Sequence, residues 1–181
     1  MLISVLVLAA TSLADPCHAQ IPAGLRPLLL TQYREHRLPS AADTSPDVLA
    51  RAFKKPNPNP KCILVARDDF NGDGREDVAT LMPLRVGSRE AVLVVAIRVG
   101  SSWRFTTLLD QPFPMEAAYV DRAPPGRTYR QSRAFDGEAI QLPAVKSLRP
   151  RHVGIAFGVQ EAWEICFFLE RGEWLRVYTS T

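Results

Sequence analysis

Two segments near the start of the chain carry apolar residues at helical spacing. Leucines and a tyrosine between Ala23 and Arg37 fall on one helical face, which predicts an amphipathic helix. A second helix is predicted to begin at Pro46, because Ser45 can cap it and proline is favoured in the first helical turn. Residues 54–61, KKPNPNPK, come next. Alternating prolines cannot continue a helix or pair inside a sheet, so we expect an extended connector there.

From residue 61 onward, short apolar runs alternate with turn residues, a pattern typical of strands. Short links favour antiparallel pairing, because parallel strands need a long crossover. The dipeptide Asp136-Gly137 predicts a hairpin turn. The predicted strands are 62–67, 77–84, 91–99, 103–109, 117–122, 138–142, 152–159, 162–170 and 174–179. In strand 162–170, four alternate residues are expected to share one face: Trp163, Ile165, Phe167 and Leu169.

These patterns predict an α+β protein in three parts. Residues 1–19 form a signal peptide, and residues 20–60 form a helical segment followed by the proline-rich connector. Residues 61–181 form a mostly antiparallel β domain. The length of 181 residues is in keeping with a single folded unit.

The first residues, MLISVLVLAATSLADPCHAQ, are typical of an export signal. The apolar run Leu2–Leu13 is too short to span a bilayer, and Cys17–Ala19 offers a cleavage site before Gln20. Ser12–Ala14 is a second candidate site. Lipidation of Cys17 and an N-terminal core helix are the alternatives. We expect cleavage after residue 19 and a periplasmic or secreted protein, with no membrane span in the mature chain.

Cleavage after residue 19 would leave two cysteines, Cys62 and Cys166. An even pair in an exported chain can form a disulfide, and such a bond would close a long loop. Both cysteines also lie in apolar runs, so two buried free thiols are the alternative. Spacing alone does not show that the two sulfur atoms meet.

Charge and composition exclude one class of partner. The net charge is only +3 and the 22 Lys and Arg residues are scattered along the chain. A protein that binds nucleic acid more often gathers its basic residues in a patch or stripe. We therefore expect no nucleic-acid partner.

Residues 68–78, DDFNGDGREDV, place five acidic side chains in one short stretch. Hard oxygen ligands at alternate positions, with a glycine at the sharp turn, are the pattern by which one loop wraps a calcium ion. Converging carboxylates repel one another unless a cation neutralises them. Thr80 stands where an EF-hand has its bidentate glutamate, so an EF-hand is not expected. A solvated acidic turn is the alternative. The predicted ligands within residues 69–77 are the side chains of Asp69, Asn71, Asp73 and Asp77 and the backbone carbonyl of Arg75.

The stretch from Asp69 to Ala79 resembles the calcium loop of FG-GAP and VCBS-type repeats, which occur in integrin-like β-propellers and many exported bacterial proteins. The resemblance implies a loop that joins two strands and holds calcium through the same five residues. The motif occurs once, and the chain after Lys61 is too short for the four or so blades that a propeller needs. The whole chain is more similar to small, single-motif exported bacterial proteins of unestablished function.

The sequence contains no recognisable catalytic motif of the nucleophile-elbow, phosphate-loop or zinc-site kind. No catalytic residue is assigned, and we expect a non-catalytic binding module of the cell envelope. Its partner would be another exported protein or an envelope component, contacted through the proline-rich loops Gln111–Met115 and Arg122–Arg127. The alternative is a periplasmic hydrolase, whose cleft would contain His152 with Glu161 or Glu164.

Overall fold

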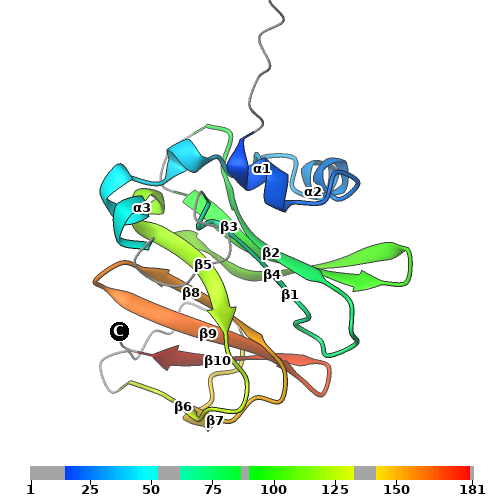
Figure 1. Cartoon of the computed structure of the whole chain (residues 1–181), viewed down its shortest axis with the longest axis vertical. Coiled ribbons are helices and arrows are strands. Elements are labelled where there is room, and N and C mark those ends of the chain that lie inside the picture. Colours follow the sequence, from blue (N-terminus) through cyan, green and yellow to red (C-terminus); the bar gives the residue numbers. More distant parts are fainter. Residues whose placement is uncertain (1–14, 53–61, 87–89, 133–141, 180–181) are drawn as a thin grey trace, which may run out of the picture.

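The computed structural model describes residues 15–52, 62–86, 90–132 and 142–179 (Figure 1). The apolar run 2–13, the connector 54–61, the turn 136–137 and most of the strand predicted at 138–142 lie outside these residues. The helices are α1 (Pro16–Gln20), α2 (Arg26–Gln32), α3 (Pro46–Ala52) and the 3-10 turns η1 (Ala41–Asp43) and η2 (Met115–Ala117). The strands are β1 (Val65–Asp68), β2 (Asp77–Pro83), β3 (Glu90–Val99), β4 (Ser102–Pro112), β5 (Ala118–Ala123), β6 (Tyr129–Arg130), β7 (Ser147–Leu148), β8 (Gly154–Val159), β9 (Trp163–Glu170) and β10 (Glu173–Thr179).

All the strand pairs are antiparallel among the described residues. The first sheet has the order β1-β2-β3-β4, the second has the order β10-β9-β8-β5, and β6 pairs with β7. The two large sheets meet where β5 passes β1, and there the Val120 amide donates to the Ile63 carbonyl at 2.7 Å. The prediction of a mostly antiparallel β protein with a few helices is confirmed.

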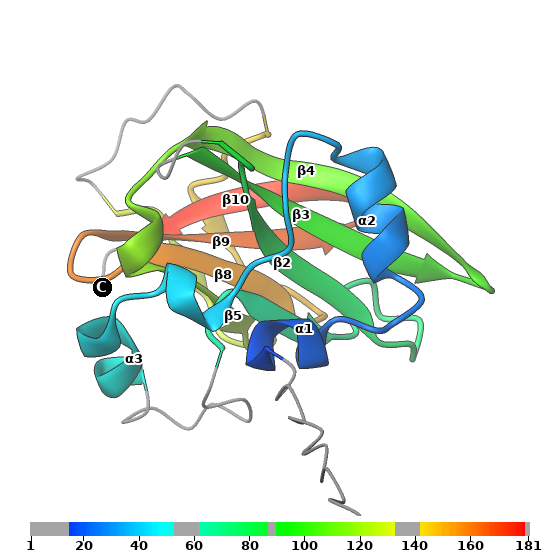
Figure 2. The same ribbon diagram turned by 90° about the horizontal axis from the view of Figure 1, so that it is seen from above.

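Helices α1 and α2 lie on the first sheet, and α3 lies near β5 of the second sheet (Figures 1 and 2). In α2, Leu29 is buried, and just beyond the helix the Tyr33 ring packs edge-on against Phe105 of β4. The helix predicted to reach Arg37 ends at Gln32, because the chain beyond it pairs with the end of β2. His36 forms a bridge to Leu84 there, so tertiary pairing overrides the helical pattern.

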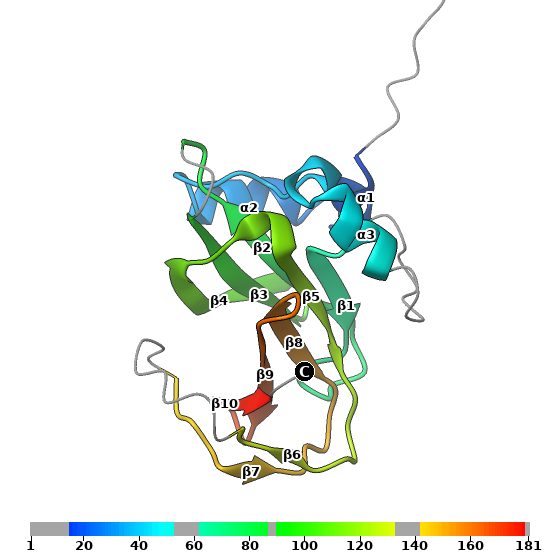
Figure 3. The same ribbon diagram turned by 90° about the vertical axis from the view of Figure 1, so that its left-hand side faces the viewer.

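The core has two parts, one on each face of the second sheet. Ile165 and Phe167 belong to the main core, and Trp163 and Leu169 pack against it, as the alternating pattern predicts. Cys166 and Phe168, which alternate with them along β9, belong to a smaller cluster on the other face. Its members are Ala123, Tyr129, Ala156, Cys166, Phe168 and Val177. The β6–β7 ribbon lies at the end of the molecule opposite the helices (Figure 3). Because both core clusters contain side chains of β9, both faces of this strand are buried.

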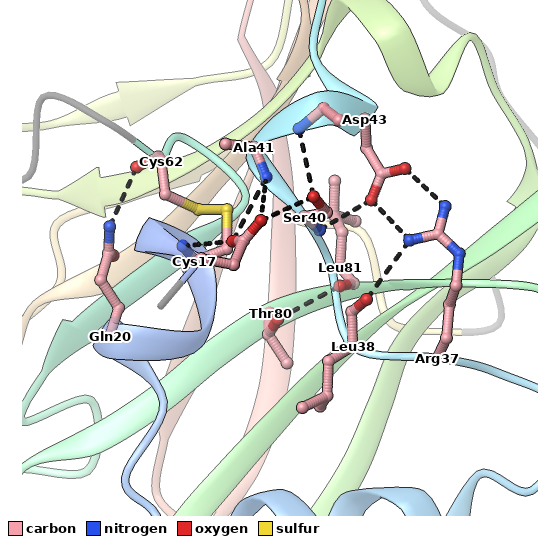
Figure 4. Close-up of a disulfide and its surroundings, with 12 residues drawn as sticks. Cys17, Gln20, Arg37, Leu38, Ser40, Ala41, Asp43, Cys62, Thr80 and Leu81 are labelled. Atoms are coloured by element: carbon pink, nitrogen blue, oxygen red, sulfur yellow. Dashed lines mark hydrogen bonds and ion pairs between the residues drawn. A yellow bond between two sulfur atoms is a disulfide. The ribbon is translucent and has the colours of Figure 1, made fainter. Parts of the chain in front are cut away.

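The disulfide differs from the prediction. Cys62 is bonded to Cys17, with 5.1 Å between their Cα atoms (Figure 4), and Cys166 is a buried free thiol. The predicted pair of Cys62 and Cys166 is wrong, because the Cys166 side chain lies in the smaller cluster while Cys62 lies beside α1. The prediction discarded Cys17 with the signal peptide, but the structure places this residue in the core.

Candidate functional site

The predicted calcium ligands lie in the hairpin that joins β1 to β2. The last pair of this ladder is Asp68 with Asp77, so residues 69–76 form the connecting loop. Gly72 and Gly74 have φ values of +74° and +81°, a backbone region that glycine enters without steric penalty. The chain forms a loop here because glycines and short polar side chains favour a tightly coiled turn.

The Asp69 carboxylate organises the loop from its centre. Its Oδ1 accepts hydrogen bonds from the amides of Gly72 at 2.7 Å and Asp73 at 3.0 Å. Its Oδ2 accepts from the Gly74 amide at 2.7 Å. Three successive amide groups therefore point at one carboxylate, which fixes the path of the loop around it.

Asn71 and Asp73 lie side by side on the same loop. Asn71 Oδ1 accepts from the Asp73 amide at 2.9 Å, and Asn71 Nδ2 donates to Asp73 Oδ2 at 3.1 Å. Asp73 Oδ1 accepts from the Arg75 amide at 2.9 Å. The side chains at these alternate positions are thus linked to one another and to the loop backbone.

Asp77 is 0% exposed. Its Oδ2 accepts from the Phe70 amide at 3.0 Å and its Oδ1 from the Arg98 amide at 2.8 Å, so it ties the loop to β3. Burial raises the pKa of Asp77 to about 6, and the charges of Asp73 and Asp69 add to this rise while the two amides oppose it. The charges of Asp73 and Asp69 therefore act on Asp77 and disfavour its charged form.

The two outer carboxylates of the stretch pair with arginines. Glu76 forms an ion pair with Arg67, and Asp68 lies 3.3 Å from the guanidinium of Arg122. Both pairs are partly exposed, where an ion pair contributes little to stability. They leave Asp69, Asn71, Asp73 and Asp77 as the candidate ligand set of the loop.

The candidate ligand set offers oxygen donors, the type that calcium takes. Within the described ranges, no group of three or more His, Cys, Asp and Glu side chains lies close enough together to hold a metal ion. The carboxylate oxygens here bond to backbone amides instead. Each carboxylate oxygen has two acceptor positions. Asp69 Oδ1 uses both for amides, but Asp69 Oδ2 and the oxygens of Asp73 and Asp77 accept one hydrogen bond each. Each of these oxygens keeps one position for a cation, and hard oxygen donors are the ligands that calcium takes.

A cleft of about 810 Å³ opens beside the loop. Asn71 and Asp73 line one side, His152 lies next to them, and the turn Glu170–Glu173 between β9 and β10 lines the other side. The His152 ring covers Gly72 so closely that an added Cβ atom would lie 2.1 Å from Cε1. The sequence predicts Arg171–Glu173 as a hairpin turn but does not predict that this turn or Arg151 belongs to a site, because residues about 80–100 positions apart on the chain reveal no shared spacing.

The cleft residues differ from those expected for a hydrolase. Glu161 forms an ion pair with Arg51 at the surface. Glu164 accepts hydrogen bonds from the hydroxyls of Tyr119 and Thr179, each at 2.8 Å. Neither glutamate lines the cleft that contains His152. The predicted combination of His152 with Glu161 or Glu164 is wrong, because β9 directs Glu164 to Tyr119 of β5 and Thr179 of β10 instead.

Cys166 lies beside this second carboxylate. Burial raises the pKa of the Cys166 thiol to about 12, and the nearby Glu164 charge contributes. The thiolate is the reactive form of cysteine, so this thiol is a structural group at neutral pH.

The two proline-rich loops differ in what they expose. Phe113 and Met115 of the first are buried in the main core. In the second, residues 124–127 are exposed, and the Arg127 guanidinium stacks over the Tyr129 ring at 4.5 Å. The first loop is thus part of the core, and only the second presents a continuous surface.

A scan against protein-family models finds no family that matches this chain, and searches of curated proteins and of solved structures find no similar chain. In the part of the chain that the structure describes, no helix is long and apolar enough to cross a membrane. The loop and the cleft are therefore the features that bear on function.

Proposed function

We propose that this protein is an exported β-rich domain that calcium stabilises. The domain acts as a non-catalytic binding module in the cell envelope. The observation that carries the proposal is the coiled loop 69–76, in which the side chains of Asp69, Asn71 and Asp73 accept hydrogen bonds from the loop backbone, followed by Asp77, which accepts from the Phe70 amide. Its resemblance to FG-GAP and VCBS calcium loops supports the same conclusion. The ligands would be Asp69, Asn71, Asp73, Asp77 and the carbonyl of Arg75.

The ion would stabilise the hairpin of β1 and β2 rather than take part in chemistry. It would neutralise the carboxylates that raise the pKa of Asp77. Because Asp77 also binds the Arg98 amide of β3, the effect would extend across the first sheet. A ligand that binds only the folded state stabilises it by mass action.

Thermal unfolding in chelator tests the calcium part of the proposal. Loops of extracellular proteins bind calcium with dissociation constants of about 10⁻⁴–10⁻³ M. At about 10 mM calcium this gives roughly 1.4–2.7 kcal/mol of stabilisation, or a Tm increase of about 3–10 °C over EDTA for a protein of this size. Sodium at matched ionic strength should not reproduce the increase, and Asp73→Ala should abolish it. A Tm that is the same in EDTA and calcium would contradict the proposal.

The cleft beside the loop is the candidate surface for an exported protein or envelope component. Arg151 and Arg171 bring positive charge to it, and Asp73, Glu170 and Glu173 bring negative charge, so a polar partner surface suits it better than an apolar one. Arg151→Glu should reduce capture of the partner from envelope extract. Arg104→Glu, at an exposed position of β4 outside the cleft, is the matched control and should leave capture unchanged.

A periplasmic hydrolase is the second candidate, because His152 lines the same cleft as Glu170. This candidate predicts turnover of an ester, amide or phosphodiester substrate that His152→Ala abolishes without changing Tm. Capture of a partner that His152→Ala leaves intact, without turnover, would favour the binding module.

A further inference from the structure

Asp15 holds two helical segments of the fold together. Asp15 Oδ1 accepts from the Cys17 amide at 2.8 Å, which caps α1. Asp15 Oδ2 accepts from the Ser40 hydroxyl at 2.6 Å, and the Ala41 amide lies 3.3 Å from the same oxygen. One carboxylate thus joins α1 to η1, and an N-cap of this kind stabilises the helix.

The next residues are equally part of the fold. Cys17 is 0% exposed and bonded to Cys62. Gln20 is 6% exposed, and its side-chain amide donates to the Cys62 carbonyl at 3.3 Å. A chain cut after Ala19 would lose the disulfide and would begin with a charged amino group at this buried residue. Burying an unpaired charge is costly.

We propose that the export signal ends at Ala14 and that the mature protein begins at Asp15. This inference rests on the proposed export. Ser12 and Ala14 supply the two small residues that signal cleavage needs, directly after the apolar run. A signal peptidase would hydrolyse the amide bond between Ala14 and Asp15. Water supplies the hydroxyl for the new Ala14 carboxylate and a proton for the new Asp15 amino group.

The new terminus is compatible with the structure. Asp15 is only half-buried, so its amino group can reach water, and its own carboxylate offsets the positive charge. The cut also retains Cys17, and the pair of Cys17 and Cys62 is then available for oxidation by the disulfide-forming machinery of an oxidising compartment. Lipidation of Cys17 is excluded by the same bond, because a thioether and a disulfide would need one sulfur atom.

The test is the intact mass of the protein recovered from the periplasm of a bacterial host, with two substitutions compared. Ala14→Lys lies outside the proposed mature chain and should cause unprocessed protein to accumulate. Ala19→Lys lies at an exposed position of α1 and should be processed normally, to a chain that starts at Asp15. Non-reducing peptide mapping of this chain should show Cys17 joined to Cys62.

Each other outcome has a definite meaning. A chain that starts at Gln20, or a loss of processing in Ala19→Lys alone, would overturn the cleavage position and leave export standing. A lipid mass on Cys17 would overturn it as well. Uncleaved protein that stays in the cytoplasm would overturn export and, with it, this inference.

Discussion

The disulfide between Cys17 and Cys62 gives the sharpest stability prediction. The two residues are 45 positions apart. In the chain-entropy model, a cross-link of this span lowers the entropy of the unfolded chain enough to stabilise the fold by about 4 kcal/mol. With a urea m-value of about 2 kcal/mol/M, breaking the bond should move the unfolding midpoint down by about 2 M.

Urea unfolding of the oxidised protein with and without dithiothreitol measures this shift. The double variant Cys17→Ser/Cys62→Ser should unfold near the reduced midpoint and show no response to the reductant. Cys166→Ala is the control, because its thiol is free in the structure, and it should keep the full response. The reasoning is refuted if reduction leaves the midpoint unchanged, or if Cys166→Ala is the variant that loses the response.

Three further predictions concern single side chains. Asp77→Ala should destabilise the fold by about 2–4 kcal/mol even in EDTA, because the buried Phe70 amide and the partly buried Arg98 amide lose their acceptor; an effect below 1 kcal/mol in urea unfolding would contradict this. Gly72→Ala should lower the free energy of unfolding by roughly 1–2 kcal/mol more than Gly74→Ala does. Both positions have positive φ, but only Gly72 lies against the His152 ring, so equal midpoints for the two variants would disprove the contact. The thiol of Cys166, with its pKa raised to about 12, should resist a thiol reagent at pH 8 in the folded protein and react in urea; rapid labelling of the folded protein would show that the site is open.

The strands of the β domain could be predicted because their signals are local. Turn residues separate the apolar runs, and consecutive runs pair in the hairpins β1–β2, β3–β4 and β9–β10. The loop at residues 69–76 was predictable for the same reason, since its glycines and aspartates are contiguous. How the sheets pack depends on contacts such as Val120 with Ile63, which leave no mark in the spacing of residues.

The disulfide and the cleft could not be predicted, for physical reasons that differ. Sequence separation does not report whether two sulfur atoms meet, and the resemblance of residues 1–19 to a signal peptide hid the role of Cys17 as a core residue. The cleft joins a loop after β1 to a turn after β9, and its charged residues look like ordinary surface positions in the sequence. The helix expected to reach Arg37 ended early because residues beyond Tyr33 pair with β2, a tertiary contact that local pattern does not encode.

Calorimetric titration with calcium tests the central claim most directly. The oxidised protein, freed of metal with EDTA and dialysed, should bind one calcium ion per chain with a dissociation constant of about 10⁻⁴–10⁻³ M. Asp73→Asn keeps an oxygen acceptor for the Arg75 amide and removes one charge, so it should weaken binding without unfolding the protein. Two results would contradict the account. One is that the folded wild-type protein binds no calcium at concentrations about 10-fold above this dissociation constant, and the other is that the Asp73→Asn variant binds calcium as tightly as the wild-type protein does.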